Sequence, residues 1–400
     1  MSDHPKFKSY DVVIIGGAIM GSATAWFLSS NPDFNGRVLV VERDISFADS
    51  STMRTNSCMR QQFSTELNVH ISQFAADFVN NFRTHLGDDP RVPELSIKSF
   101  GYMYLAGDRA MEQRLRRDQA VQVTAGAATE LLSPEDIAAR YPFYNLEDVT
   151  LGSINTVDEG YWDGAAVFDW LRRKAREGGV EYIENTVTDL DVADGRVTHL
   201  HLAAGTRVAC GQVVNAAGPR ASDVAAMAGI DLPVEPRKRY TWVFRAERPL
   251  DRPLPLTIDP SGVHVHDNGG GTYLCGSKGF DDPAVAASDF AMDFSLWEGH
   301  VWPALAHRIP QFEAIRVQAE WAGHYAMNTL DQNAIVGPHP DLPNFLFLNG
   351  FSGHGLQQAP AMGRGLAEWI TYGNYRSIDL SPFSFDRIAA NVPLVEHAVI

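Results

Sequence analysis

Four residues, Gly16, Ala18, Gly21 and Glu42, have the spacing of a site that holds a dinucleotide. The turn after an apolar run reads GGAIMG, where the dinucleotide fingerprint has glycine at all three positions. Gly16 allows the tight turn, Gly21 allows close helix packing, and Ala18 adds one methyl group where backbone approaches a pyrophosphate. Glu42 lies about 20 residues after Gly21. In dinucleotide sites, an acidic residue at about this distance from the glycine turn binds a ribose hydroxyl. We therefore predict a nucleotide site, with a plain strand–turn–helix as the alternative.

The segment after Glu42 separates FAD from NAD. It reads RDISFADSSTMRTNSCMRQQFS, which is polar and rich in Ser, Thr and Asn. A dehydrogenase that uses NAD would run directly into its next strand and helix. The polar segment therefore favours FAD.

Two histidines, His264 and His266, alternate with valines in the run GVHVHDNGGG. Alternation along a strand places both imidazoles on one face of a sheet. If that face turns toward the flavin, both rings line a substrate pocket. A metal site is disfavoured, because no nearby carboxylate or cysteine completes a ligand set.

The hydrophobic pattern indicates the elements that position these residues. Buried strands are expected at YDVVIIGG, RVLVVER, QVVNAAGP and NFLFLNG, and helices follow the first and the last. Three further helices are expected. Ser64 is the expected N-cap of one and Ser133 of another, and the third is expected to end at Gly178. A hairpin is expected at VTDLDVADGRVTHLHL, with Asp194 and Gly195 in its turn.

The middle of the chain has the pattern of an antiparallel sheet, with the runs RYTWVF and TYLCG between turns rich in Pro and Gly. The expected fold class is α/β (α+β overall), a Rossmann-like FAD-binding domain with an inserted antiparallel β-sheet substrate domain. The expected boundaries are 1–85, 150–228 and 325–400 for the FAD-binding domain and 86–149 and 229–324 for the substrate-binding domain.

The composition is that of a folded protein, with 45% apolar and 20% charged residues. A formal net charge of −16 argues against nucleic acid as a partner, since that needs a basic surface. Cys58, Cys210 and Cys275 are too far apart for a redox pair or a zinc site, so reduced thiols are expected. There is no apolar run of membrane-spanning length and no secretory signal, so a cytoplasmic protein without a membrane span is expected.

The chain resembles the FAD-dependent superfamily of D-amino-acid oxidase, glycine oxidase and sarcosine oxidase in GGAIMGSATAWFL, SSTMRTNSCMRQQFS, VVNAAGP and NGFSGHGLQQAPAMGRGLAEWI. Within it, the chain is most similar to the branch of the mitochondrial complex I assembly factor with an FAD-dependent oxidoreductase domain. The segments PRKRYTWVF, DPSGVHVHDNGGGTYLCG and IDLSPFSF also resemble that branch. The resemblance runs nearly end to end.

The resemblance implies FAD. No cysteine follows Cys275, so FAD is expected without a covalent link, with a histidyl link at His324 as the alternative. In the family, the segment after the second strand wraps the diphosphate and the flavin ring, and the last helix starts at the flavin pyrimidine. A helix N-terminus there would stabilise the negative charge that builds when flavin accepts a hydride. The residues expected at the cofactor are Gly16, Ala18, Ile19, Met20, Gly21, Glu42, Arg43, Ser50, Ser51, Thr52, Asn56, Met59, Arg60, Val187, Ala217, Gly218, Gly353, His354, Gly355 and Leu356.

The resemblance also implies an amine or amino-acid oxidase or dehydrogenase. It would oxidise the C–N bond of an amino acid or N-substituted amino acid by hydride transfer to flavin, and the imine would then hydrolyse. This reaction needs orientation and a neutral amine more than a strong base. The expected partners are a small amino-acid-like substrate and oxygen or a redox partner as electron acceptor. The residues expected at the substrate are Arg60, His264, His266, Tyr325, His354 and Gln357, with Tyr273 and Trp321 as further pocket candidates.

Several positions depart from related oxidases. His324 matches the flavin-bonding cysteine of monomeric sarcosine oxidases, and no cysteine occurs after Cys275. Gln357 stands where those enzymes have a lysine for the substrate carboxylate, and Leu274 stands near the match for their oxygen-activating lysine. His266 lies near the match for the arginine of glycine and D-amino-acid oxidases. These departures weigh against sarcosine oxidase activity and fast reaction with oxygen.

If the substrate bears a carboxylate, Arg60 is the first candidate for its partner, because a guanidinium binds such a group at two points. A structural or flavin-contacting arginine is an equally supported interpretation of Arg60. Lys238 and Arg239 are alternatives, although a solvated basic turn is the preferred interpretation of that pair. The alternative function is an FAD-containing assembly or scaffold protein with little or no catalysis. An NAD-dependent dehydrogenase ranks third.

Overall fold

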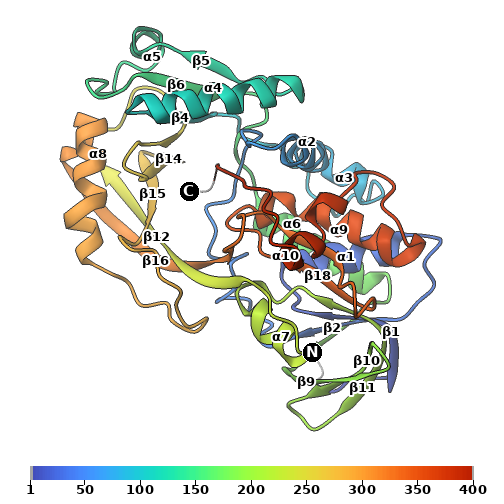
Figure 1. Ribbon diagram of the computed structural model, residues 1–400. Coiled ribbons are helices and arrows are strands. Elements are labelled where there is room, and N and C mark those ends of the chain that lie inside the picture. Colours follow the sequence, from blue (N-terminus) through green and yellow to red (C-terminus); the bar gives the residue numbers. More distant parts are fainter. Residues whose placement is uncertain (1–2, 399–400) are drawn as a thin grey trace.

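The computed structural model describes residues 3–398, which form two large sheets with strands drawn from separated parts of the chain (Figure 1). The first sheet has the order β17-β18-β11-β1-β2-β8, and along this path only the β17–β18 pair is antiparallel. A hairpin of β9 and β10 extends from β11. The strands are β1 (Ser9–Ile15), β2 (Val38–Glu42), β8 (Glu181–Glu184), β9 (Val187–Ala193), β10 (Arg196–Leu202), β11 (Arg207–Asn215), β17 (Ile335–Pro338) and β18 (Phe345–Asn349).

Helices lie against both faces of this sheet, which is why its strands are continuous apolar runs. On one face α1 packs against α9 and α6, and α2 packs against α9. The approach of α1 to α9 is close, because a Cβ at Gly363 would lie 2.6 Å from the Cβ of Ala23. On the other face α7 packs with β9. These helices are α1 (Ile19–Ser30), α2 (Glu66–Asn80), α3 (Phe82–His85), α6 (Gly164–Glu177), α7 (Ala221–Met227) and α9 (Gly355–Tyr372).

The second sheet has the order β16-β12-β15-β14-β13-β4-β6-β5, and only the β13–β4 pair is parallel. Trp242, Phe244 and Phe312 fill the core on one face of it. Its strands are β4 (Tyr102–Ala106), β5 (Glu130–Leu132), β6 (Leu151–Asn155), β12 (Val234–Ala246), β13 (Leu256–Ile258), β14 (His264–Gly269), β15 (Thr272–Lys278) and β16 (Ile315–Asn328). Its helices are α4 (Arg109–Thr124), α5 (Pro134–Arg140) and α8 (Trp302–Arg308).

The expected fold class is confirmed: a sheet of the nucleotide-binding type and a separate, mainly antiparallel sheet share one chain. The strand–turn–helix of β1 and α1, the hairpin with Asp194 and Gly195 at positive φ, and the Ser133 cap of α5 are all present. The end of α6 at Gly178 is confirmed as well. The expected domain boundaries stay a prediction.

The expected cap at Ser64 is wrong. α2 begins at Glu66 after Thr65, and no side chain caps it through the usual local bond. The Ser64 hydroxyl instead donates to the carboxylate of Glu396 at 2.7 Å. A buried carboxylate from the distant C-terminal segment thus takes the hydroxyl that was expected to cap the helix.

The remaining elements connect the two sheets. A short two-stranded sheet pairs β3 (Cys58–Met59) with β7 (Gly160–Tyr161) between them. The last elements are η4 (Ser381–Phe383) and α10 (Asp386–Ala389), after which the chain runs toward the space between the sheets (Figure 1). Within residues 3–398, no helix combines the length and apolarity that a membrane crossing requires.

Candidate functional site

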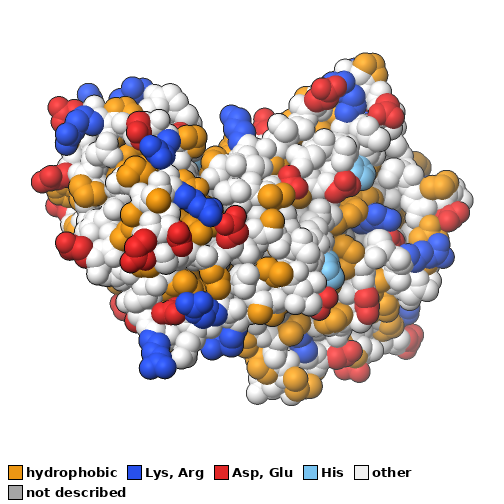
Figure 2. Space-filling view, turned by 90° about the horizontal axis from the view of Figure 1, so that it is seen from above, with side chains coloured by type: hydrophobic (Ala, Val, Ile, Leu, Met, Phe, Trp, Pro, Cys, Tyr) orange, Lys and Arg blue, Asp and Glu red, His pale blue; other side chains and the backbone are white. Residues whose placement is uncertain are grey.

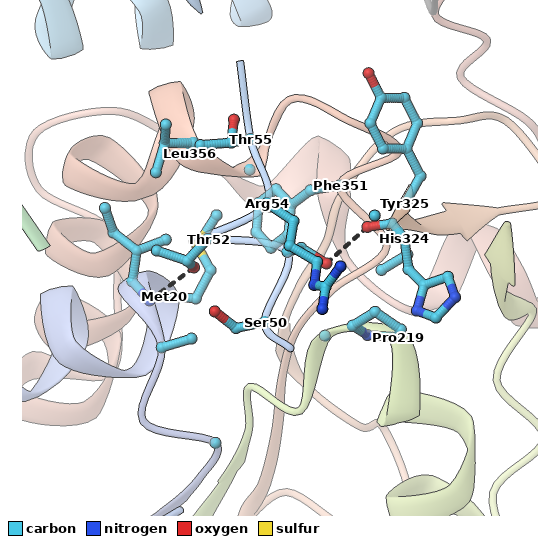
Figure 3. A pocket seen from close by; sticks show the side chains of 18 of the residues that line it. Met20, Ser50, Thr52, Arg54, Thr55, Pro219, His324, Tyr325, Phe351 and Leu356 are labelled. Carbon is cyan, nitrogen blue, oxygen red and sulfur yellow. Dashed lines mark hydrogen bonds between the residues drawn. The ribbon is translucent and has the colours of Figure 1, made fainter. Parts of the chain in front are cut away.

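A single cavity of about 400 Å³ joins the glycine turn after β1 to the second sheet. Figure 3 shows Met20 and Thr52 on one side of it and His324 and Tyr325 on the other. A cavity of this volume is in the range of ligand sites. On the face of the molecule seen in Figure 2, acidic and basic side chains are interspersed, unlike the basic stripe of a nucleic-acid-binding surface.

The glycine turn is built for close backbone approach. Gly16 has φ +101°, and a Cβ there would lie 2.4 Å from the carbonyl oxygen of Ala216. A Cβ at Gly21 would lie 1.9 Å from the carbonyl oxygen of Gly16. The N-cap of α1 is Ala18 on the cavity wall, which has no polar side chain to cap the helix, and the Thr52 hydroxyl accepts from the N–H of Ile19 at 3.3 Å. The N-terminus of α1 can therefore stabilise an anion in the cavity.

Glu42 ends β2 at the same end of the cavity. Its carboxylate accepts hydrogen bonds from the backbone N–H of Gly17 at 2.8 Å and of Asp44 at 3.0 Å. Burial raises the pKa of Glu42, and these two bonds oppose the rise. Glu42 thus holds the glycine turn in place and lines the site.

The start of α9, Gly353 to Leu356, is a second helix N-terminus on the cavity wall, which we call the α9 cradle. Gly353 has φ +96°, and a Cβ there would lie 2.3 Å from the Tyr325 ring. The helix begins at Gly355, and its N-cap residue His354 makes no capping bond with its side chain. Because Gly353 and the first helical residue, Gly355, carry no side chain, another molecule can come close to the first N–H groups of the helix.

Arg60 is 5% exposed and lies on the cavity wall. Its Nη2 pairs with Nε2 of His354 at 2.8 Å and donates to the carbonyl of Ala398. Burial and the charge of Arg60 hold the pKa of His354 well below its usual range, so the ring is neutral and Nε2 accepts. Nε of Arg60 has no partner within residues 3–398. A buried guanidinium with an unused donor suits an anionic ligand.

His264 presents a second unused donor. The Asn56 side-chain oxygen accepts from Thr241, so its amide nitrogen donates to Nε2 of His264 at 2.8 Å. That assignment leaves the ring proton on Nδ1, which has no partner among the described residues. Burial, followed by the charges of neighbouring groups, lowers the pKa of His264 to about 3. The ring is therefore neutral at physiological pH.

The structure gathers most of the residues predicted from the sequence on this one cavity. Those that line it are Gly16, Ala18, Ile19, Met20, Glu42, Arg43, Ser50, Ser51, Thr52, Asn56, Arg60, Val187, Ala217, Gly218, His264, Tyr325, Gly353, His354, Gly355, Leu356 and Gln357. His324 also lines it, and its Nε2 is taken by the carbonyl of Asp289 at 2.8 Å.

Other predicted residues lie behind the wall. Gly21 and Met59 are buried off the cavity. His266 stacks on Phe100, and its Nδ1 pairs with the Asp267 carbonyl. Two further pocket candidates do not line the cavity. Tyr273 stacks on Phe244 in the core of the second sheet, and Nε1 of Trp321 donates to the Arg54 carbonyl.

Gln357 is fully engaged with the protein. Its Oε1 accepts from the backbone N–H of Arg60 at 3.0 Å, and its Nε2 donates to the carbonyl of Arg60 and to Ser72. The side chain therefore fixes the backbone of Arg60 rather than reaching into the cavity.

The interpretation of Lys238 and Arg239 as a solvated basic turn is wrong, because both lie within β12. Arg239 is 8% exposed, pairs with Asp282 at 2.7 Å and lies over the Tyr325 ring on the cavity wall. Lys238 pairs with Asp289 at 2.7 Å. The available signal in the sequence was the strand-like run RYTWVF, which begins at Arg239 itself. In the structure β12 extends over Val234–Ala246 and includes both residues.

Sequence reasoning missed many residues of the wall, among them Tyr102 and Leu256. Tyr102 and Leu256 pair across the parallel β4–β13 contact, which no local pattern reveals. Burial raises the pKa of the Cys58 thiol, so it is protonated at neutral pH. The alternating aromatic residues of β4 were the available signal, since Tyr102 and Tyr104 share a face.

Comparisons with known proteins agree with this geometry. A family model described as FAD dependent oxidoreductase (DAO) matches residues 11–369. FAD-dependent oxidoreductase domain-containing protein 1 of Bos taurus is 36% identical over 98% of this chain and 87% of its own length. Mitochondrial sarcosine dehydrogenase of Homo sapiens is 26% identical over 92% of this chain and 40% of its own. The crystal structure of L-proline dehydrogenase from P. horikoshii superposes with a TM-score of 0.82, 25% identity and coverage of 96% of this chain and 98% of that one.

Proposed function

The chain belongs to the FAD dependent oxidoreductases of the DAO family, and from this membership we propose that it oxidises the C–N bond of a carboxylated amine. The substrate class we propose is an amino acid or an N-substituted amino acid. The single observation that carries the proposal is the unpartnered Nε of buried Arg60 on the same cavity as the glycine turn.

The residues of the cavity fit the family's cofactor, FAD. The start of α1 beside Gly16 and Ala18 would hold the pyrophosphate, and Glu42 would hold the ribose. The start of α9 at Gly353 to Leu356 would face the flavin pyrimidine, where its N-terminus stabilises negative charge. When bound, FAD supplies a two-electron acceptor for the oxidation.

Arg60 would bind the substrate carboxylate. Its guanidinium is desolvated by burial, so a carboxylate that reaches Nε gains a charge-assisted bond which water does not weaken. The bond to His354 and the clamp of Gln357 on its backbone orient the side chain. Arg60 would thus fix one end of the substrate and set the orientation of the carbon to be oxidised.

The amine end would meet neutral groups. His264, with a pKa of about 3, carries no charge at physiological pH and is too weak a base to remove a proton from an ammonium group. Its Nδ1–H is a donor, which favours a neutral amine with its lone pair available. The substrate would therefore have to arrive as the free amine, and the reaction rate would rise with pH as substrate deprotonates.

The experiment that tests the proposal uses purified flavoprotein without oxygen. A panel of D-amino acids, N-methyl amino acids and opine-like secondary amines is added, and the visible flavin band is followed. Bleaching by a carboxylated amine supports the proposal. A flavoprotein that no member of the panel reduces contradicts it and favours an FAD-containing scaffold. Readmission of air to the reduced protein then reports whether oxygen is an acceptor.

A further inference from the structure

The C-terminal segment 391–398, which we call the C-terminal strap, crosses the molecule to reach Arg60. It is bound along its length by the loop before β17: the N–H of Leu394 donates to the Asp331 carboxylate at 3.0 Å, and the N–H of Glu396 donates to the Asp331 carbonyl at 2.9 Å. Asn333 donates to the carbonyl of Leu394 at 2.6 Å. Figure 1 shows the strap leaving α10 toward the second sheet.

Glu396 anchors the strap and is 0% exposed. Its Oε1 accepts from the N–H of Ser64 at 2.8 Å, the hydroxyl of Ser64 at 2.7 Å and the N–H of Ala398 at 3.0 Å. Its Oε2 accepts from the Thr65 hydroxyl at 3.1 Å and the Asn68 amide at 2.9 Å. These donors surround the start of α2, where a carboxylate is stabilised by the helix dipole.

The tip of the strap holds Arg60. The carbonyl of Ala398, two residues after Glu396, accepts from Nη2 of Arg60, the same nitrogen that pairs with His354. The Ala398 side chain packs on a small cluster that includes Phe63 of the Arg60 segment and Ala125 after α4. Nη2 is thus fixed from two sides, while Nε stays without a partner.

We propose that Glu396 is a positioning residue for substrate recognition, acting through the Ala398 carbonyl to hold the Arg60 guanidinium, whose Nε has no partner within residues 3–398, at the cavity wall. The proposal rests on the proposed function, because it assigns the carboxylate to Arg60. A free arginine side chain loses rotamer entropy when it binds, and a guanidinium already held in place does not. Glu396 also supplies negative charge near Arg60, which stabilises the buried cation.

The test compares Glu396→Gln with Glu368→Gln in the holoenzyme. Glu368 is a matched control: it is 8% exposed, accepts the backbone N–H groups of Arg376 and Ser377, and lies near the far end of α9. The probe is acetate, titrated while the visible flavin spectrum is recorded, and thermal unfolding is measured beside it.

We expect Glu396→Gln to raise the Kd for acetate about tenfold, because a weakened anchor lets the Ala398 carbonyl move away from Nη2 of Arg60 and frees the guanidinium. The KM of the substrate should rise by a similar factor while kcat stays within about twofold. Glu368→Gln should lower the unfolding temperature but leave the acetate Kd unchanged. Glu396→Asp, which keeps the charge on a shorter side chain, should recover part of the affinity.

Two outcomes separate this inference from the proposed function. If Arg60→Lys leaves acetate affinity unchanged, the carboxylate site itself is wrong. If Arg60→Lys weakens acetate binding but Glu396→Gln does not, the positioning role is overturned. Should Glu396→Gln fail to fold, Thr65→Val removes only one of its donors; we expect a smaller rise in Kd, and an unchanged Kd in this soluble variant counts against the proposal.

Discussion

Nη2 of Arg60 and Nε2 of His354 lie 2.8 Å apart, although the residues are separated by 294 positions in the chain. The contact joins the polar segment after β2 to the start of α9, so the two parts of the site cannot be placed independently. The two groups can be buried side by side without like-charge repulsion because His354 is neutral, with its pKa held well below the usual range by burial and by the charge of Arg60. The charge of Arg60 thus remains available to a ligand.

Arg60→Lys should lower kcat/KM for the carboxylated substrate by about 30- to 100-fold, the loss of a charge-assisted bond of about 2–3 kcal/mol. An ammonium group lacks the planar donor pair and cannot keep the bond to His354 in the same geometry. Steady-state kinetics measure the effect. Arg140→Lys, a side chain 47% exposed on a surface ion pair, is the control and should change kcat/KM little.

Stability should fall in acid because His264 is neutral in the folded state. Its folded pKa of about 3 lies below the unfolded value of 6.5, so the unfolded state binds the proton first. Above pH 6.5 the imidazole is neutral in both states and does not change the free energy of unfolding. As pH falls from 6.5 toward 3, protonation of the unfolded state lowers the free energy of unfolding.

His264→Gln removes this titration but keeps an acceptor for Asn56. Between pH 7.5 and 5.5 the variant should lose about 1 kcal/mol less unfolding free energy than the parent. Urea unfolding at each pH measures the difference. Parallel curves for the two proteins would show that His264 does not titrate as described.

Gly353→Ala should weaken FAD binding and lower stability by about 2 kcal/mol or more. Its Cβ would meet the Tyr325 ring at 2.3 Å, and φ of +96° strains any other residue. Gly373→Ala is the matched control at the opposite end of α9: φ is +75°, but nothing lies within 4 Å of the new Cβ. The control should cost about 1 kcal/mol and leave the flavin content unchanged. Equal effects of the two substitutions would mean that backbone strain alone, and not the α9 cradle, is responsible.

Ala18 tests the placement of the pyrophosphate. Ala18→Gly should leave FAD bound, whereas Ala18→Val, with more bulk at the cavity wall, should weaken binding about tenfold. The flavin-to-protein ratio after dialysis measures this. Full flavin content in the valine variant would place the pyrophosphate elsewhere.

The parts of this fold that could be predicted from sequence are those set by local chemistry. β1 and α1 follow from an apolar run and a glycine turn, and the β9–β10 hairpin follows from Asp194 and Gly195 at positive φ. The Ser133 cap follows from a serine before a proline, which begins the helix. Most of the residues expected at the cofactor came instead from the family resemblance, and all of them except Gly21 and Met59 line the cavity.

What could not be predicted depends on contacts between distant segments. The Ser64 hydroxyl donates to Glu396, 332 positions away, instead of capping α2. No rule that uses only neighbouring residues could have predicted this partner. Tyr102 reaches the cavity because β4 pairs in parallel with β13. Arg239 is buried because Asp282, from the loop after β15, neutralises it. In each case tertiary contacts decided the position of a polar side chain.

We propose that Arg60 selects a carboxylated amine for oxidation by the bound flavin. The most direct measurement uses a matched pair: a carboxylated amine that bleaches the flavin band without oxygen, and the same amine without its carboxylate. We expect rapid bleaching by the first compound, slow or no bleaching by the second, and loss of this preference in Arg60→Lys. Equal bleaching by both compounds, or a preference that survives in Arg60→Lys, would contradict it.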